Sequence, residues 1–410
     1  MSKVIVIGGG AAGMMAAFSA ASVGHEVILL EKNEKLGKKI YITGKGRCNF
    51  TNCCDTEDFF KNVVTNPKFL YSALYTYPSD FVVDFFESHG TATKVERGNR
   101  AFPVSDHASD ITRAFSNALK DNHVQIKLNT KVIKLIVKDN VVSGVVLEDG
   151  VNLSSDHVIV CTGGLSYKTT GSTGDGLRFA KELDIKVSAT RPALVPMECQ
   201  EKYIIDMQGL SLKNVELSIY NGQKQLFKDF GEMLFTHFGV SGPLVLSASS
   251  KVGRYLETVD SLIAIIDLKP ALSKDMLEDR LLREFKDNQN KKLITVVRSL
   301  VPASMVDAII EVSKVDGDKQ INSVTREERE SIIYALKEFP FTITGLRDYN
   351  EAIVTQGGVA VKEIDPSTMM VKNYKGLSFA GEVIDVDAFT GGFNLQIAFS
   401  TGYLAGISID

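Results

Sequence analysis

The chain has 410 residues, enough for two or three domains, and 44% of them are hydrophobic, which excludes wholesale disorder. Its formal charge of −4 at pH 7 provides no general attraction to nucleic acid or to an anionic membrane surface. No uninterrupted apolar run reaches the roughly 18 residues that a membrane-spanning helix needs, so we expect no membrane partner.

The N-terminal segment and the number of cysteines indicate in which cellular compartment the protein is expected. The first residues lead directly into a short apolar strand, without the apolar region and cleavage site of a signal peptide, so we expect a cytoplasmic protein. An odd number of cysteines fits a reducing compartment better than a disulfide framework; they are Cys48, Cys53, Cys54, Cys161 and Cys199. Because no CxxC motif occurs and the histidines are scattered, we expect no metal site.

The N-terminal segment predicts a strand–helix–strand unit. Residues 3–7 (KVIVI) are an apolar run rich in β-branched residues, and residues 11–22 are rich in alanine, which favours a helix. Residues 26–30 (EVILL) form a second apolar run. This order is typical of the first unit of a Rossmann-type α/β domain.

The next part of the chain alternates between predicted helices and strands. Residues 32–52 are irregular and contain glycines, and residues 124–161 predict strands separated by turns. Helices are predicted at about 56–64, 67–76, 78–89, 106–122 and 174–183.

The pattern changes near residue 191. Short strand-like runs occur at about 194–198, 213–220 and 262–267, and residues 271–330 carry Leu and Ile at helical spacing. Strands return from about 340, and a strand, a loop and a helix occupy 377–407. We therefore predict one dinucleotide-binding domain with parts 1–190 and 345–410, interrupted by an insert at 191–344 that is β-rich over 191–270 and helical over 271–337.

The turn after the first strand carries a GxGxxG motif formed by Gly8, Gly10 and Gly13. The first glycine permits the tight turn, the second lets a pyrophosphate approach the backbone, and the third lets the helix pack on the strand. Ala11 and Ala12 open the helix, whose free N–H groups and positive dipole end would face the phosphates.

Glu31 ends the second strand, where a carboxylate accepts hydrogen bonds from the ribose hydroxyls of a bound dinucleotide. The same carboxylate would repel a 2′-phosphate, so NADP is disfavoured at this site. With strand, helix, second strand and acid all in order, the motif predicts a dinucleotide site rather than a merely glycine-rich turn.

The C-terminal stretch GLSFAGEVIDVDAFTGGFNLQIAFSTGYLAG (376–406) resembles the returning unit that closes the FAD site in the glutathione-reductase and fumarate-reductase superfamily. The resemblance implies FAD rather than NAD, with Glu382 or Asp385 facing the ribityl or pyrophosphate region. A helix starting near Gly392, with Asn394 and Leu395 in its first turn, would point its N-terminus at the flavin pyrimidine edge and stabilise negative charge on the reduced flavin.

Three further stretches resemble the BaiN/YhiN-like flavoprotein family, also labelled bile-acid 4,6-reductase-like or aminoacetone-oxidase-like. They are TGKGRCNFTN (43–52), CTGGLSY with TGSTGDGLRFAKEL (161–183) and EMLFTHFGVSGP (232–243). With the two terminal units, the resemblance covers essentially the whole chain. It implies a Rossmann-type FAD-binding domain interrupted by a β-barrel-like and helical insert.

The resemblance also implies cofactor contacts. Lys32 follows the ribose acid, and Gly46, Arg47 and Asn49 lie in the loop beside the flavin. Arg47 would donate to a phosphate or a flavin carbonyl, or it is a solvated loop arginine. Two strand positions complete the set, Val132 beside the adenine (or simply in the strand core) and Gly163 at the end of the strand entering the cleft. Because residues 32–52 contain no histidine, covalent attachment of FAD by the route known in fumarate-reductase relatives is excluded.

The group that donates the proton is not evident from the sequence. His237, among glycines and a proline, is a candidate for a general acid, although its position in a turn fits a hydrogen-bonded structural histidine better. Cys48 and Cys53 have the CxxxxC spacing of flavin disulfide reductases, but Asn49, Thr51 and Asn52 interrupt any helix there. Because no second GxGxxG follows a strand, NAD(P)H would dock only transiently as an electron donor.

The predicted function is an FAD-dependent oxidoreductase, a reductase or dehydrogenase of a small organic molecule, with a steroid-like enone as the substrate class that the resemblance suggests. A small-amine oxidase is the alternative. An FAD-dependent RNA-modifying protein is a third, and it should carry a basic helical insert. Residues 271–330 hold 11 Lys and Arg against 12 Asp and Glu, so a nucleic-acid partner is not expected.

Overall fold

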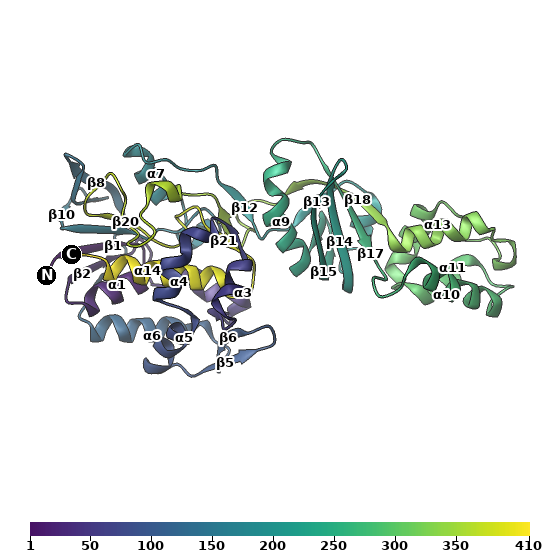
Figure 1. The fold of residues 1–410 in the computed structure, drawn as a ribbon, viewed down its shortest axis with the longest axis horizontal. Coiled ribbons are helices and arrows are strands. Elements are labelled where there is room, and N and C mark those ends of the chain that lie inside the picture. The colour runs from purple at the N-terminus through teal and green to yellow at the C-terminus, as the bar shows by residue number, and fades with distance from the viewer. The chain divides into compact units, whose positions relative to one another are not determined.

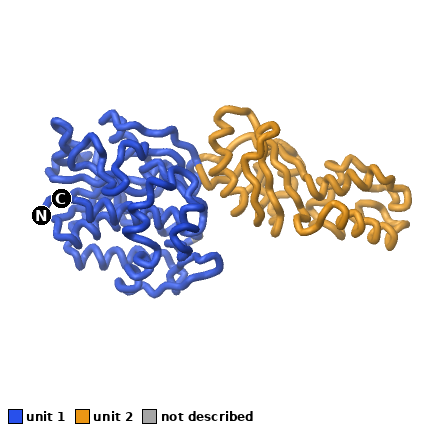
Figure 2. The backbone as a smooth tube through the Cα atoms, in the orientation of Figure 1, with its two compact units in different colours: residues 1–192, 349–410 blue, residues 193–348 orange. Residues whose placement is uncertain are grey.

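The structure, a computed structural model, describes residues 1–410, with the side chain of Lys45 excepted. The chain forms two compact units, one of Met1–Pro192 with Tyr349–Asp410 and one of Ala193–Asp348 (Figure 2). Each unit has its own hydrophobic core. None of the described helices is both long and apolar enough to cross a membrane.

The first unit is built on a five-stranded sheet in which every neighbouring pair is parallel. Its strand order is β20–β11–β1–β2–β7, with β1 in the centre. The strands are β1 (Lys3–Ile7), β2 (Glu26–Leu30), β7 (Gln125–Lys127), β11 (His157–Val160) and β20 (Leu377–Phe379). The central strands are apolar at nearly every position because the sheet is covered on both faces. A strand near the C-terminus, β20, thus joins a sheet begun by the first strand of the chain.

Two helices from opposite ends of the chain pack against each other on this sheet (Figure 1). They are α1 (Ala11–Ser22) and α14 (Phe393–Ile407). Glycines in α14 permit their close approach: a Cβ at Gly402 would lie 2.4 Å from the Ala12 carbonyl oxygen, and one at Gly406 would lie 2.6 Å from that of Ala16. This packing fixes the N-terminal ends of both helices in one rigid body.

The other elements of the first unit surround this frame. The helices are α2 (Lys38–Ile42), α3 (Thr56–Lys61), α4 (Tyr71–Thr76), α5 (Ser79–Ser88), α6 (Ala108–Asp121) and α7 (Asp175–Glu182). The strands are β3 (Thr51–Asn52), β4 (Val63–Thr65), β5 (Thr93–Glu96), β6 (Arg100–Pro103), β8 (Val132–Lys138), β9 (Val141–Leu147), β10 (Asn152–Ser154), β12 (Arg191–Ala193), β19 (Val354–Gln356) and β21 (Asp387–Ala388).

The second unit contains a closed antiparallel barrel with strand order β13–β16–β15–β14–β17–β18. The strands are β13 (Met197–Cys199), β14 (Ser211–Asn221), β15 (Lys224–Thr236), β16 (Gly239–Ser241), β17 (Leu262–Asp267) and β18 (Phe339–Leu346). The long strand β15 was not among the predicted strands, because four of its residues are charged and its side chains are buried on one face only.

Helices complete the second unit. They are α8 (Lys202–Asp206), α9 (Pro243–Leu256), α10 (Lys274–Asp287), α11 (Leu293–Leu300), α12 (Val306–Ser313) and α13 (Arg326–Lys337). The last of them begins with a capping box between Thr325 and Glu328, which satisfies its first backbone N–H groups. A Rossmann-type domain interrupted by a barrel and helices confirms the predicted fold class.

Candidate cofactor site

A cavity with about 1320 Å³ of empty space, partly open to solvent, lies in the first unit at the carboxyl ends of β1, β2 and β11. Ligands of open parallel sheets bind at this end, where the order of the strands reverses. Both sequence halves of the unit line the cavity, from the loop after β1 to the first turn of α14. The site therefore exists only when the two halves are folded together.

The three glycines of the motif after β1 have different structural roles. Gly8 has a φ of +104°, and a Cβ there would lie 2.5 Å from the Cys161 carbonyl oxygen. A Cβ at Gly13 would lie 1.8 Å from the carbonyl oxygen of Gly8, so this glycine allows α1 to pack on β1. A Cβ at Gly10 would meet nothing within 4 Å. Gly10 lines the cavity. Its lack of a side chain therefore leaves space for a ligand, and protein packing does not require a glycine there.

Glu31 lines the cavity and is only 7% exposed. Its carboxylate accepts hydrogen bonds from the backbone N–H of Gly9 at 2.7 Å, from that of Asn33 at 2.8 Å and from the Asn33 side-chain amide at 2.7 Å. Since a carboxylate offers about four acceptor positions, capacity remains for a ribose hydroxyl.

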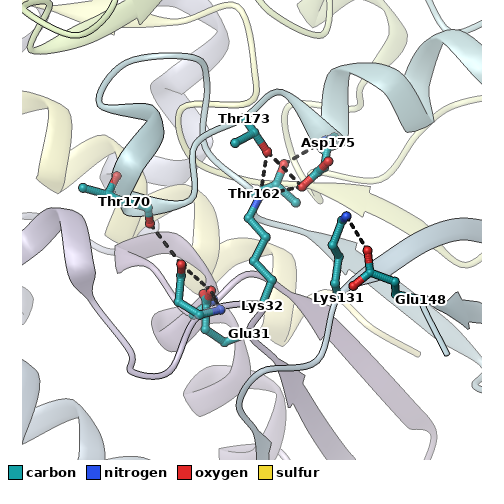
Figure 3. A network of polar contacts seen from close by, with 11 residues as sticks. Glu31, Lys32, Lys131, Glu148, Thr162, Thr170, Thr173 and Asp175 are labelled. Carbon is teal, nitrogen blue, oxygen red and sulfur yellow. Dashed lines mark hydrogen bonds and ion pairs between the residues drawn. The ribbon is translucent and has the colours of Figure 1, made fainter.

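A network of hydrogen-bonded side chains extends from the Glu31 segment across the rim of the cavity (Figure 3). Lys32 Nζ donates to Asp175 at 2.7 Å and to Thr173 Oγ1 at 2.6 Å, while the Asn33 amide donates to the Thr170 carbonyl oxygen at 3.1 Å. These bonds attach the loop before α7 to the end of β2. The loop before α7 and the end of β2 therefore form one connected wall of the cavity.

Lys39, which the sequence analysis did not single out, projects from α2 into the cavity. Its Nζ lies 2.7 Å from Glu382 Oε2 and 2.5 Å from Ser166 Oγ. Glu382 also accepts from Ser166 Oγ and from the Thr355 N–H, both at 2.8 Å. The structure thus places a lysine and a fully hydrogen-bonded carboxylate between the phosphate loop and α14, and no local motif in the sequence signals the lysine.

The N-terminus of α14 is held against the loop that carries Asn49. A Cβ at Gly392, whose φ is +98°, would lie 2.3 Å from the Thr51 carbonyl oxygen and 2.9 Å from Asn49 Oδ1. Thr51 Oγ1 donates to Gln396 Oε1 at 2.5 Å, and the Asn394 side chain donates to the Ala388 carbonyl oxygen at 2.7 Å. The first turn of α14 is therefore fixed from both sides.

The residues present fit FAD. Among the described side chains, Asn49 Oδ1 is a buried acceptor without a hydrogen-bond partner, beside the helix N-terminus where the flavin ring is expected. At the other end, the cradle above Gly10 would be filled in part by a Cβ. Asn49 itself does not line the cavity, so the fit rests on the open space above Gly10 and on the polar side chains of the lining, Glu31 and Lys39.

The predicted cofactor residues separate into two groups. Those that line the cavity are Gly8, Gly10, Ala11, Ala12, Glu31, Lys32, Val132, Gly163, Glu382, Asn394 and Leu395. Those that do not are Gly13, Gly46, Arg47, Asn49, Asp385 and Gly392. Gly13, Asn49 and Gly392 support the cavity from behind through the contacts described above, whereas the Asp385 carboxylate accepts from Ser188 Oγ at 2.7 Å.

Arg47 is engaged away from the cavity lining. Its guanidinium donates to Glu96 and to Asp106, with nitrogen–oxygen distances of 2.5 and 2.6 Å, and stacks on Phe102 at 4.2 Å. Hydrogen bonding by Arg47 lowers the pKa of Glu96, and hydrogen bonds from Lys94 and Arg47 lower that of Asp106. The β5–β6 hairpin supplies the carboxylate of Glu96, and that long-range pairing was not visible in the sequence.

The candidates for chemistry remain without a demonstrated role. His237 is exposed on the turn between β15 and β16, with its ring edge against Phe238. Burial raises the pKa of the Cys48 thiol to about 12 and is the main cause that raises that of Cys54 to about 11. Burial also raises the pKa of Cys53, so both thiols with the CxxxxC spacing, Cys48 and Cys53, are protonated near neutral pH, which disfavours a redox pair. Among the described residues, no cluster of three or more His, Cys, Asp or Glu side chains could hold a metal ion.

Comparison with known proteins places this geometry in a family. The pattern described as the HI0933-like protein Rossmann domain matches residues 2–408. The chain is 30% identical to the 3-dehydro-bile acid delta(4,6)-reductase of Clostridium scindens, over 99% of this chain and 98% of that protein. It is 31% identical to the ribosomal RNA dihydrouridine synthase of Haemophilus influenzae, over 100% and 98% of the two chains. The synthase of Escherichia coli is 29% identical over 97% and 96%.

Solved structures agree on the fold. The 3-ketosteroid delta1-dehydrogenase of Sterolibacterium denitrificans has a TM-score of 0.54 at 14% identity, covering 99% of this chain and 98% of that one. The 3-ketosteroid-delta4-(5alpha)-dehydrogenase of Rhodococcus jostii RHA1 has a TM-score of 0.51 at 14% identity, covering 99% and 96%. The predicted family resemblance is confirmed: this protein belongs to the HI0933-like family and is an FAD-dependent oxidoreductase.

Proposed function

We propose that this protein reduces a carbon–carbon double bond conjugated to a carbonyl group, using FAD bound non-covalently in the cavity of the first unit. The observation that carries the proposal is the full-length similarity to a protein named as a delta(4,6)-reductase of 3-dehydro bile acids. A small steroid-like enone is the substrate class that follows from that name.

Each end of the cavity has residues suited to one part of FAD. The Gly10 loop and the N-terminus of α1 would bind the pyrophosphate, Glu31 the ribose, and the backbone at Val132 the adenine. Lys39 would offset the phosphate charge near the ribityl chain, held in place by Glu382. FAD, when bound, supplies the hydride chemistry, and the positive end of α14 favours negative charge at the ring beside it.

The substrate also needs a proton, and the electrons need a source. NAD(P)H is the proposed donor, docking transiently, because the sequence contains no second GxGxxG unit. The proton comes from a side chain or from water within hydrogen-bonding reach of the substrate.

A uridine in ribosomal RNA is a second candidate substrate, because two relatives of full coverage are named ribosomal RNA dihydrouridine synthases. Dihydrouridine differs from uridine by reduction of the C5=C6 bond, which is also conjugated to a carbonyl. One chemistry therefore covers both relatives, and the substrate is what separates them. The small-amine oxidase remains the third alternative.

The test is anaerobic reduction of the purified yellow protein, followed by separate mixing with a 3-oxo-4-ene steroid acid, a uridine-containing rRNA fragment and oxygen. Rapid reoxidation of the flavin absorbance by the steroid, with the saturated product found by mass spectrometry, supports the main proposal. Dihydrouridine in the RNA supports the second candidate. Rapid reoxidation by oxygen alone supports an oxidase and contradicts both reductases, and a protein that binds no FAD contradicts all three.

A further inference from the structure

A second hollow in the first unit, with about 720 Å³ of empty space, opens to solvent beside the first turn of α14. It is bounded by the segment after β3, by α3, by the turn between β5 and β6 and by the residues that lead into α14. Phe393 lines this hollow, and the next residue, Asn394, lines the cofactor cavity. The two spaces therefore meet at consecutive residues in the first turn of α14.

The hollow carries a cation that the protein leaves without a counter-ion. Arg100 is exposed on its wall, its Nε donates to the Arg97 carbonyl oxygen at 3.1 Å, and its guanidinium lies 5.8 Å from the centre of the Phe102 ring. Among the described residues, no carboxylate forms an ion pair with it. The other cation of the wall, Lys61, is paired with Asp58 at 2.6 Å. The wall therefore has one unpaired positive charge.

Asn52 fixes this charge relative to α14. The residue is 4% exposed, and its side-chain amide donates to the Gly98 carbonyl oxygen and to the Gly391 carbonyl oxygen, both at 3.0 Å. Gly98 belongs to the turn that carries Arg100, and Gly391 precedes α14. One buried amide thus joins the arginine-bearing turn to the loop at the flavin edge, so the distance between them is set by the fold.

We propose that this hollow is the substrate site of the first unit and that Arg100 binds an oxyanion of the substrate, a carboxylate or a phosphate. The inference rests on the proposed function and deepens it, because it explains how an enone is oriented. A guanidinium binds carboxylate and phosphate through paired N–H donors. Anchoring the acidic group of the substrate there would leave its uncharged, unsaturated part free to reach across the first turn of α14.

The chain offers a matched control for this test. Arg97 lies on the same turn and is exposed, and no described carboxylate pairs with it, but it does not line the hollow. Arg97→Gln therefore removes the same charge from the same hairpin. Both variants should retain wild-type flavin content and absorbance, because neither residue touches the cofactor cavity.

The probe is a 3-oxo-4-ene steroid carboxylic acid beside its methyl ester, each titrated into the oxidised holoenzyme by flavin absorbance and assayed for reduction. Arg100→Gln should raise the Kd and KM for the acid about tenfold, change those for the ester less than twofold, and exceed the effect of Arg97→Gln severalfold. An rRNA fragment forms the phosphate arm, in which Arg100→Gln should lower the slope of log affinity against log salt by about one.

The experiment distinguishes a failure of the oxyanion site from a failure of the proposed function. Equal losses for acid and ester, or equal effects of the two arginine variants in every arm that binds, would overturn the oxyanion site while leaving the reductase intact. If the wild type binds the acid but reduces neither probe nor RNA, the proposed function fails, and the acid-to-ester ratio of Kd values in Arg100→Gln still decides the site.

Discussion

At the residue scale, the glycines after β1 show that one motif can serve two purposes. Gly8 and Gly13 are required by the protein itself, because a Cβ at either would overlap a backbone carbonyl oxygen. Gly10 has an extended backbone and open space above it, so the protein alone would tolerate a side chain there. The motif therefore combines a packing requirement with a ligand requirement.

Two alanine substitutions separate these requirements. Gly10→Ala should change the free energy of unfolding of the apoprotein by less than about 1 kcal/mol, while raising the Kd for FAD at least tenfold. Gly13→Ala should cost more than about 3 kcal/mol, because its methyl group meets a fixed carbonyl oxygen. Urea unfolding of the apoproteins and FAD titration by fluorescence measure both effects. An unstable Gly10→Ala apoprotein would contradict this division.

Glu31 illustrates a carboxylate whose charge is used by the protein and by the expected ribose. Glu31→Gln keeps the size of the side chain but faces an amide donor toward the donors of Gly9 and Asn33. FAD affinity should fall 10- to 100-fold, about 1.4–3 kcal/mol. Glu34→Gln is the control, since Glu34 is an exposed partner of Lys38 outside the cavity lining. Flavin release during dialysis would separate them, and equal release from both variants would argue against the ribose role.

At the element scale, pairing of β11 with β20 joins strands that are far apart in the sequence and creates a buried polar contact. His157 Nε2 and Ser378 Oγ lie 2.9 Å apart in the sheet. Burial lowers the pKa of His157 to about 4. The folded protein therefore holds this imidazole neutral, whereas the unfolded chain protonates it near pH 6.5.

This difference predicts a pH dependence of stability. Above about pH 6.5 both states are neutral and nothing is lost. Between pH 6.5 and 4 only the unfolded chain takes up the proton, so stability falls as pH falls, by an amount on the order of 3 kcal/mol at pH 4. His157→Gln keeps a polar side chain without titrating, so its urea midpoint should decline less steeply over this range. Parallel declines of variant and wild type would exclude His157 as the cause.

At the scale of the whole molecule, the chain has two cores that share no strand of the central sheet or of the barrel. The sheet of the first unit uses residues from both ends of the chain, and the barrel closes entirely within Ala193–Asp348. Every residue that lines the cofactor cavity belongs to the first unit. The insert therefore contributes no residue to the lining of the cofactor cavity.

Replacing 193–348 by a flexible Gly/Ser linker of about eight residues should leave a folded protein that binds FAD. It should keep the flavin absorbance and show a cooperative thermal transition, because the sheet and the α1–α14 pair are complete. A colourless, unfolded product would mean that the first unit depends on the insert. The matched measurement is the isolated 193–348 segment, whose closed barrel should give its own cooperative unfolding.

The sequence by itself determined the family and the fold class, and it located the glycine-rich turn after β1 and Glu31 at the end of β2, because these depend on spacing within one strand–helix–strand unit or on motifs along the chain. It did not determine the partners of Arg47, Lys39 and Glu382, which include residues up to 343 positions away. It also missed the neutral state of His157 and the hollow beside α14. Charged side chains select partners by distance in space, and which carboxylate or carbonyl oxygen comes within reach is decided only when both ends of the chain pack into one sheet.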